Sequence, residues 1–129
     1  MAVGRREEAA GMFTIVAGTD PQVLVVRVEG ELDITSVDAR RSDLDRAIHD
    51  HLERVSTAVG GPSLVVIDLR SVTILSAAGL HMLGELAVGL GQQWISTAVA
   101  VQPESIARRL LYLAGLDQRL VVLDAPLPG

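Results

Sequence analysis

A short apolar run, Leu-Val-Val-Ile at residues 64–67, is the feature that most constrains the fold of this chain. The run is rich in β-branched residues and is followed by Asp68, a pattern typical of a strand that is buried on both faces of a sheet. A short turn follows, and a helix is predicted to begin near Ser76. Strands joined through helices pair in parallel by right-handed crossovers, so this unit predicts an α/β domain.

The residues before this run predict a hairpin and a helix. Residues 13–16 and 23–29 are predicted strands, and the Gly-Thr-Asp-Pro sequence at 18–21 supplies the turn between them. Thr35 and Asp38 form a variant of a capping box, which indicates the start of a helix. The apolar positions that follow with helical spacing are Val37, Leu44, Ile48, Leu52 and Val55. A Gly-Gly-Pro sequence at 60–62 ends this helix.

The residues after the run continue the alternation of helices and strands. The helix from Ser76 to about residue 90 has a predicted buried stripe, made of Gly79, Met82, Leu83, Leu86 and Leu90. Residues 97–101 and 120–123 are predicted strands. Between them, Pro103 is predicted to open a helix that turns Ile106, Leu110 and Leu113 inward and ends at Gly115. The element order ββαβαβαβ predicts an α/β fold with a mixed sheet and with helices mainly on one face.

The length of 129 residues fits one domain with a substantial core. We expect a flexible tail at residues 1–11, a domain at 12–124 and a C-terminal tail at 125–129. The chain has no cysteine, no apolar stretch typical of a signal peptide and no run of about 18 apolar residues. These features predict a cytoplasmic protein without membrane insertion.

Composition argues against several classes of function. The net charge is −5, and basic residues cluster only in the pairs at 5–6, 40–41 and 108–109, which argues against nucleic-acid binding. His49 and His51 would point to different faces of a helix, so they do not predict a metal site. The sequence has no P-loop, dinucleotide fingerprint or G-x-S-x-G elbow. We therefore expect neither a cofactor nor enzymatic activity.

Two motifs occur in a fixed order along the chain. The first is Gly-Glu-Leu-Asp at residues 30–33, and the second is Val-Ile-Asp-Leu at 66–69 with Val-Thr-Ile-Leu at 72–75 and the Gly79–Leu80 pair. Together they resemble the STAS domain of bacterial anti-sigma factor antagonists, over roughly residues 13–123. The resemblance implies a non-enzymatic protein that binds an anti-sigma factor, usually a serine kinase of the histidine-kinase-like ATPase type. Such binding frees a sigma factor for transcription.

The resemblance also implies a phosphoacceptor serine at the start of the second helix, but this chain departs from the pattern there. The acceptor position holds Ala77, and Ser76 and Ala78 stand where the family has aspartate and a second serine. A phosphate adds about −1.5 to −2 charges, which a partner surface that fits a neutral serine would reject. Ala77 cannot carry that charge, so control by phosphorylation is in doubt.

Three interpretations of this departure stay open. The protein binds its partner but escapes kinase control; or Ser76 or Thr73 replaces the lost acceptor; or the domain has become a scaffold or a subunit of another complex. Ser76 has a structural interpretation as well, because serine is a preferred N-cap residue.

The predicted partner-binding surface combines three segments. They are the loop with Asp33, Thr35 and Ser36, the turn with Thr73, Ser76, Ala77 and Ala78, and the exposed face of the second helix with His81 and Glu85. His81 and Glu85 are four residues apart and are expected to form a solvated pair.

Other functions of a STAS-like domain are a subunit of a transport or lipid-trafficking ABC complex and a ligand-sensing domain. The chain also ends soon after its last predicted strand, without the final helix that family members often carry. The face that this helix would cover is expected to be available to a partner or a homodimer.

Overall fold

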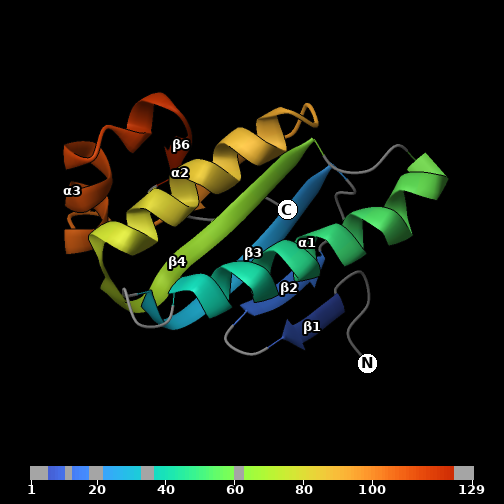
Figure 1. Ribbon diagram of the computed structural model, residues 1–129, viewed down its shortest axis with the longest axis horizontal. Coiled ribbons are helices and arrows are strands. Elements are labelled where there is room, and N and C mark those ends of the chain that lie inside the picture. The colour runs from blue at the N-terminus through green and yellow to red at the C-terminus, as the bar shows by residue number, and fades with distance from the viewer. Residues whose placement is uncertain (1–5, 11–12, 18–21, 33–36, 60–62, 124–129) are drawn as a thin grey trace.

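The computed structural model describes residues 6–10, 13–17, 22–32, 37–59 and 63–123 of the chain. In this part, one six-stranded sheet follows the order of the chain. Its strands are β1 (Arg6–Ala10), β2 (Phe13–Ala17), β3 (Val23–Leu32), β4 (Leu64–Leu75), β5 (Ser96–Ala100) and β6 (Val121–Leu123) (Figure 1). Pairing is antiparallel from β1 to β3 and parallel from β3 to β6. The prediction of a mixed α/β sheet is confirmed.

The parallel strands are joined by α1 (Val37–Val59), α2 (Ala77–Gly91) and α3 (Ile106–Leu113), and a 3-10 turn, η1 (Leu116–Gln118), precedes β6. Figure 1 shows α1 and α2 lying side by side across one face of the sheet. All three helices contribute side chains to the same apolar core, including Leu44, Leu83 and Leu111. The helices therefore cover the same face, as the sequence predicted.

The apolar run that opens β4 is buried on both faces of the sheet. Val65, Val66 and Ile67 are all 0% exposed. Val65 and Ile67 belong to the core beneath the helices, whereas Val66 belongs to a second cluster with Val25 and two alanines of β5. The stripe predicted for α2 is also buried throughout.

The structure corrects the interpretation of the first residues as a flexible tail. Residues 6–10 form β1, which pairs with the whole of β2. The sequence Arg-Glu-Glu-Ala-Ala lacks the β-branched alternation of a strand, so no pattern indicated it. Its pairing depends on backbone hydrogen bonds, which any of these residues can form.

The segment expected as a turn between residues 70 and 75 is a continuation of β4. Two register shifts, after Arg27 and after Gly30 of β3, give β4 extra residues relative to its partner. Bulges of this kind let a strand continue with altered twist, and Val72 and Thr73 have the β-branched side chains that favour it. The turn to α2 is therefore confined to Ser76.

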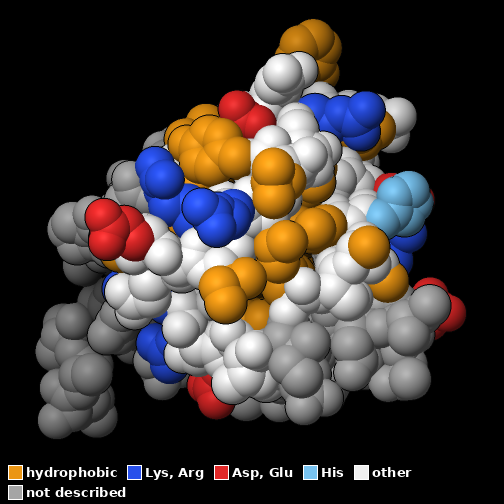
Figure 2. Space-filling view, turned by 90° about the vertical axis from the view of Figure 1, so that its left-hand side faces the viewer, with side chains coloured by type: hydrophobic (Ala, Val, Ile, Leu, Met, Phe, Trp, Pro, Cys, Tyr) orange, Lys and Arg blue, Asp and Glu red, His pale blue; other side chains and the backbone are white. Residues whose placement is uncertain are grey.

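α3 differs from its prediction in both start and orientation. It begins at Ile106, and the side chain of Ser105, not Pro103, caps it by accepting a hydrogen bond from the Arg108 N–H at 3.1 Å. Ile106 and Leu113 are 78% and 76% exposed, whereas Leu111 is fully buried and Leu110 packs against the core as predicted. The stripe was misjudged because the last helix packs at the border of the core, where spacing alone does not tell which of two apolar stripes faces inward. Figure 2 shows hydrophobic side chains on the surface at this end of the molecule.

Gly115 has φ +74°, the left-handed conformation that ends helices, so its predicted role after α3 is confirmed. No helix among the described residues combines the length and the apolar character needed to cross a bilayer.

A matched pair of substitutions tests the orientation of α3. Leu111→Ala should lower the free energy of unfolding by about 2–5 kcal/mol, because it leaves a cavity in the core. Ile106→Ala, on the exposed side, should change it by less than about 0.5 kcal/mol. Urea denaturation measures both, and equal losses would contradict the observed orientation.

Candidate functional site

The start of α2 is fixed by Ser76. This residue has extended backbone angles, and its Oγ accepts a hydrogen bond from the Gly79 N–H at 3.2 Å. Such a bond satisfies one of the amide groups that have no partner inside the helix. The structural interpretation of Ser76 as an N-cap is confirmed, and its hydroxyl is half-buried in this role.

Ala77, His81 and Glu85 follow each other at four-residue intervals and are all exposed. We call these three residues the exposed stripe of α2. His81 Nε2 lies 3.1 Å from Glu85 Oε1, which confirms the predicted pair. Ala78 is half-buried beside them. At Ala77, the first residue of the stripe, the surface of this chain therefore presents a methyl group.

Thr73 lies near the end of β4 and is exposed. Its Oγ1 donates a hydrogen bond to the carbonyl oxygen of Gly30 at 3.1 Å, so it links the ends of β4 and β3. Asp33, Thr35 and Ser36 lie outside the described residues. The structure thus places Thr73 and Ala77, the first residue of the exposed stripe, at the same end of the sheet, while the predicted loop lies outside the described residues.

Arg41 of α1 belongs to this surface and was not predicted. Its Nη1 lies 2.8 Å from Glu85 Oε1, and its Nε lies 3.6 Å from Asp45. Ion pairs this exposed contribute about 0–1 kcal/mol, so their effect is mainly to orient Glu85. A contact between residues 44 positions apart leaves no periodic signal in a sequence.

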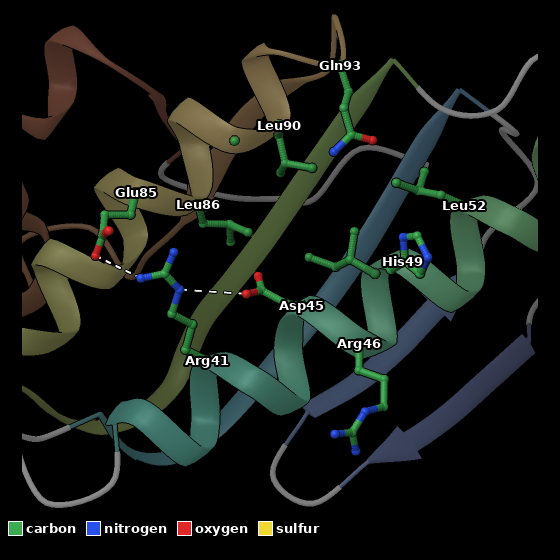
Figure 3. A pocket seen from close by; sticks show the side chains of 11 residues that line it. Arg41, Asp45, Arg46, His49, Leu52, Glu85, Leu86, Leu90 and Gln93 are labelled. Atoms are coloured by element: carbon green, nitrogen blue, oxygen red, sulfur yellow. Dashed lines mark hydrogen bonds and ion pairs between the residues drawn. The ribbon is translucent and has the colours of Figure 1, made fainter.

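A groove of about 460 Å³ lies between α1 and α2. Figure 3 shows Leu86 and Leu90 pointing from α2 toward α1, and Arg41 reaching across to Glu85. The lining residues are Arg41, Asp45, Arg46, Ile48, His49, Leu52, Glu85, Leu86, Gly89, Leu90 and Gln93. The groove has apolar side chains such as Leu86 and Leu90 and charged side chains such as Arg41 and Glu85. It borders the exposed stripe at Glu85.

A second groove, of about 760 Å³, lies on the other side of α2 and is lined by the whole exposed stripe. Its opposite wall comes from the turn after α3, including Leu116 and Arg119. Gly84 permits this arrangement, because a Cβ there would lie 3.2 Å from Leu116 Cδ2. The exposed stripe therefore stands between two hollows, a shape that can receive side chains of a partner.

Asp68 has a structural role inside β4. Its carboxylate is buried and accepts hydrogen bonds from the Arg70 guanidinium at 3.0 and 3.1 Å and from the Arg70 backbone N–H at 3.0 Å. The hydrogen bonds that Arg70 donates to Asp68 raise the pKa of Arg70 above its usual value. The pair lies within β4, the strand that leads to α2, and does not belong to the exposed stripe.

Within the described ranges, no group of three or more histidine, aspartate or glutamate side chains could hold a metal ion.

Comparison with known proteins places these features in a family. A family model described as "STAS domain" matches residues 14–125. The crystal structure of an anti-sigma factor antagonist from Mycobacterium paratuberculosis is similar, with 26% sequence identity and a TM-score of 0.60. The match covers 94% of this chain and 85% of that chain. No curated protein matches the sequence.

Two structures of SpoIIAA share the fold at lower identity. The anti-sigma factor antagonist SpoIIAA in its unphosphorylated form is 16% identical, with a TM-score of 0.58 over 92% of this chain and 86% of that one. The phosphorylated form, described as a Bacillus cell fate determinant, is also 16% identical, with a TM-score of 0.53 over 92% of this chain and 89% of that one.

The cap of α2 predicts a specific pattern of stability. Ser76→Ala should lower the free energy of unfolding by about 0.5–2 kcal/mol, because the Gly79 N–H loses its partner. Ser76→Asp should keep the stability close to that of the original protein, since aspartate caps helices equally well. Thermal or urea unfolding measures the stability of both variants. An equal loss of stability in both would contradict the capping role.

Proposed function

The chain belongs to the STAS domain family, and we propose that it is an anti-sigma factor antagonist that binds its partner through the start of α2. The observation that carries this proposal is the exposed stripe of α2, which begins at Ala77, directly after the Ser76 cap. The similarity to the mycobacterial antagonist supports the class of partner.

The proposed partner is an anti-sigma factor, a serine kinase of the histidine-kinase-like ATPase type. The protein would sequester this kinase in the cytoplasm and so release a sigma factor. This role is binding and not catalysis. Arg41, Glu85 and His81 give the surface polar groups, while Ala77 and the grooves beside α2 give it apolar area. That mixture is typical of a non-obligate interface.

We further propose that binding escapes control by phosphorylation. Ala77 has no hydroxyl at the acceptor position. The hydroxyl of Ser76 is half-buried and accepts the capping bond from Gly79. Thr73 is exposed, but its hydroxyl is bound to the Gly30 carbonyl and lies within a strand. The hydroxyl groups of Ser76 and Thr73, the two replacement acceptors considered, are thus engaged in structural bonds, which supports this interpretation over a replacement at either position.

A charge at the proposed contact tests the binding surface. Ala77→Glu should weaken binding of the anti-sigma factor at least about tenfold, because a carboxylate would be buried without a partner. The fold should persist, since an acidic residue in the first turn of a helix is favourable.

The matched control is Ser96→Glu, which adds the same charge at the exposed first residue of β5. It should leave affinity unchanged. The partner is first isolated with the unmodified protein and identified by mass spectrometry, and calorimetry with each variant follows. Recovery of ABC-transporter components instead of an anti-sigma factor, or equal affinity of the Ala77→Glu variant, would count against the proposal.

Restoring the hydroxyl tests the escape from kinase control. Incubation with the partner kinase and ATP should leave the original protein unmodified, whereas Ala77→Ser should gain one phosphate, located by tandem mass spectrometry. Serine at this position would be exposed, as Ala77 is, and therefore reachable by a kinase. A phosphate on Ser76 or Thr73 of the original protein would show that another residue has replaced the acceptor.

A further inference from the structure

The outer face of α3 carries several apolar side chains that do not pack in the core. Ile106 and Leu113 are 78% and 76% exposed, and Tyr112 is 44% exposed. Within the described α3, only Leu111 is fully buried. We define the outer face of α3 as Ile106, Arg108, Arg109, Tyr112 and Leu113, which line one shallow depression. Clustered exposed apolar side chains of this kind mark interaction sites.

This face also carries positive charge in an acidic protein. Arg108 and Arg109 are adjacent on it, and one acidic residue, Glu104, lines the same depression. The Arg108 guanidinium lies 5.0 Å from the centre of the Tyr112 ring, a cation–π distance that orders both side chains. The whole chain has a net charge of −5. The complement of this face is therefore apolar and acidic.

A further hollow connects α3 with the end of β4. It has a volume of about 290 Å³, and its lining includes Val72, Thr73 and Leu75 of β4 together with Ile106, Ala107 and Leu110 of α3. Leu75 directly precedes the Ser76 cap. Figure 2, which views this end of the molecule, shows hydrophobic side chains gathered beside arginines. The apolar surface thus continues from α3 toward the start of α2.

We propose that the outer face of α3 binds an acidic, amphipathic segment of a partner protein. Apolar side chains of that segment would pack on Ile106 and Leu113, and its carboxylates would pair with Arg108 and Arg109. This inference rests on the proposed function in one respect. If the anti-sigma factor binds at the start of α2, the same partner would also cover the neighbouring outer face of α3.

Two other occupants are disfavoured. A two-fold dimer through α3 would bring the arginines of both copies into one interface with only Glu104 of each copy to offset them. Insertion into a membrane is disfavoured because the eight residues of α3 offer little apolar length. An acidic protein segment meets neither objection.

Site-specific photo-crosslinking in cells of the source organism tests the inference. The photoreactive residue p-benzoylphenylalanine replaces Leu113, Ala77 or, as an exposed control in the turn after α2, Trp94. After irradiation, mass spectrometry identifies the crosslinked peptide. The expected result is an adduct at position 113 with a segment rich in aspartate, glutamate and apolar residues, and none of this kind at position 94.

Binding of the purified partner to two charge variants provides the second readout. Arg109→Glu should weaken binding at least about tenfold. Ser96→Glu, which adds a negative charge at the exposed first residue of β5 and away from both grooves, should leave it unchanged. Equal affinities of the two variants would overturn the inference.

The crosslinking outcomes separate this inference from the proposed function. An anti-sigma factor adduct at position 77 without an adduct at 113 overturns the role of α3 and leaves the proposed function standing. An acidic segment of some other protein at position 113 supports the role of α3 while the proposed function fails. Adducts at 113 with lipid, with a second copy of this chain or with a protein segment that lacks acidic residues overturn the inference.

Discussion

The burial of Val65, Val66 and Ile67, the opening run of β4, on both faces is the constraint on which the rest of the structure depends. A run without a polar face must lie inside the sheet, so β3 and β5 pair on either side of it. Parallel pairing then requires crossover helices, and these place α1 and α2 on one face. Because β4 runs directly into the Ser76 cap, the same strand fixes where the candidate site begins.

Features with a local signal could be predicted from the sequence. The buried stripe of α2, the Ser76 cap and the His81–Glu85 pair each follow from the spacing of neighbouring residues, and the structure confirms them. Features that arise between distant segments could not. β1 is held by pairing with β2, and Arg41 meets Glu85 across two helices. The orientation of α3 depends on how the helix packs at the border of the core. The spacing of its apolar residues does not tell which side faces inward.

The candidate site places Ala77, which has no polar side-chain group, next to residues whose side chains make structural hydrogen bonds. The side chains of Asp68 and Arg70 pair within β4, and the Ser76 side chain caps the first turn of α2, so neither of these bonds involves the side chain of Ala77. A substitution at this exposed position should therefore change folding little. Under the proposed function, the difference between a phosphorylation switch and a constant binder is confined to this one side chain.

That confinement has an evolutionary consequence. Every alanine codon becomes a serine codon by a change of its first base, from G to T. Since Ala77 is exposed and the cap before it is already in place, such a mutation would meet no steric barrier. Under the proposed function, a lineage carrying this protein could therefore gain or lose kinase control of the interaction in a single mutational step, with the scaffold unchanged.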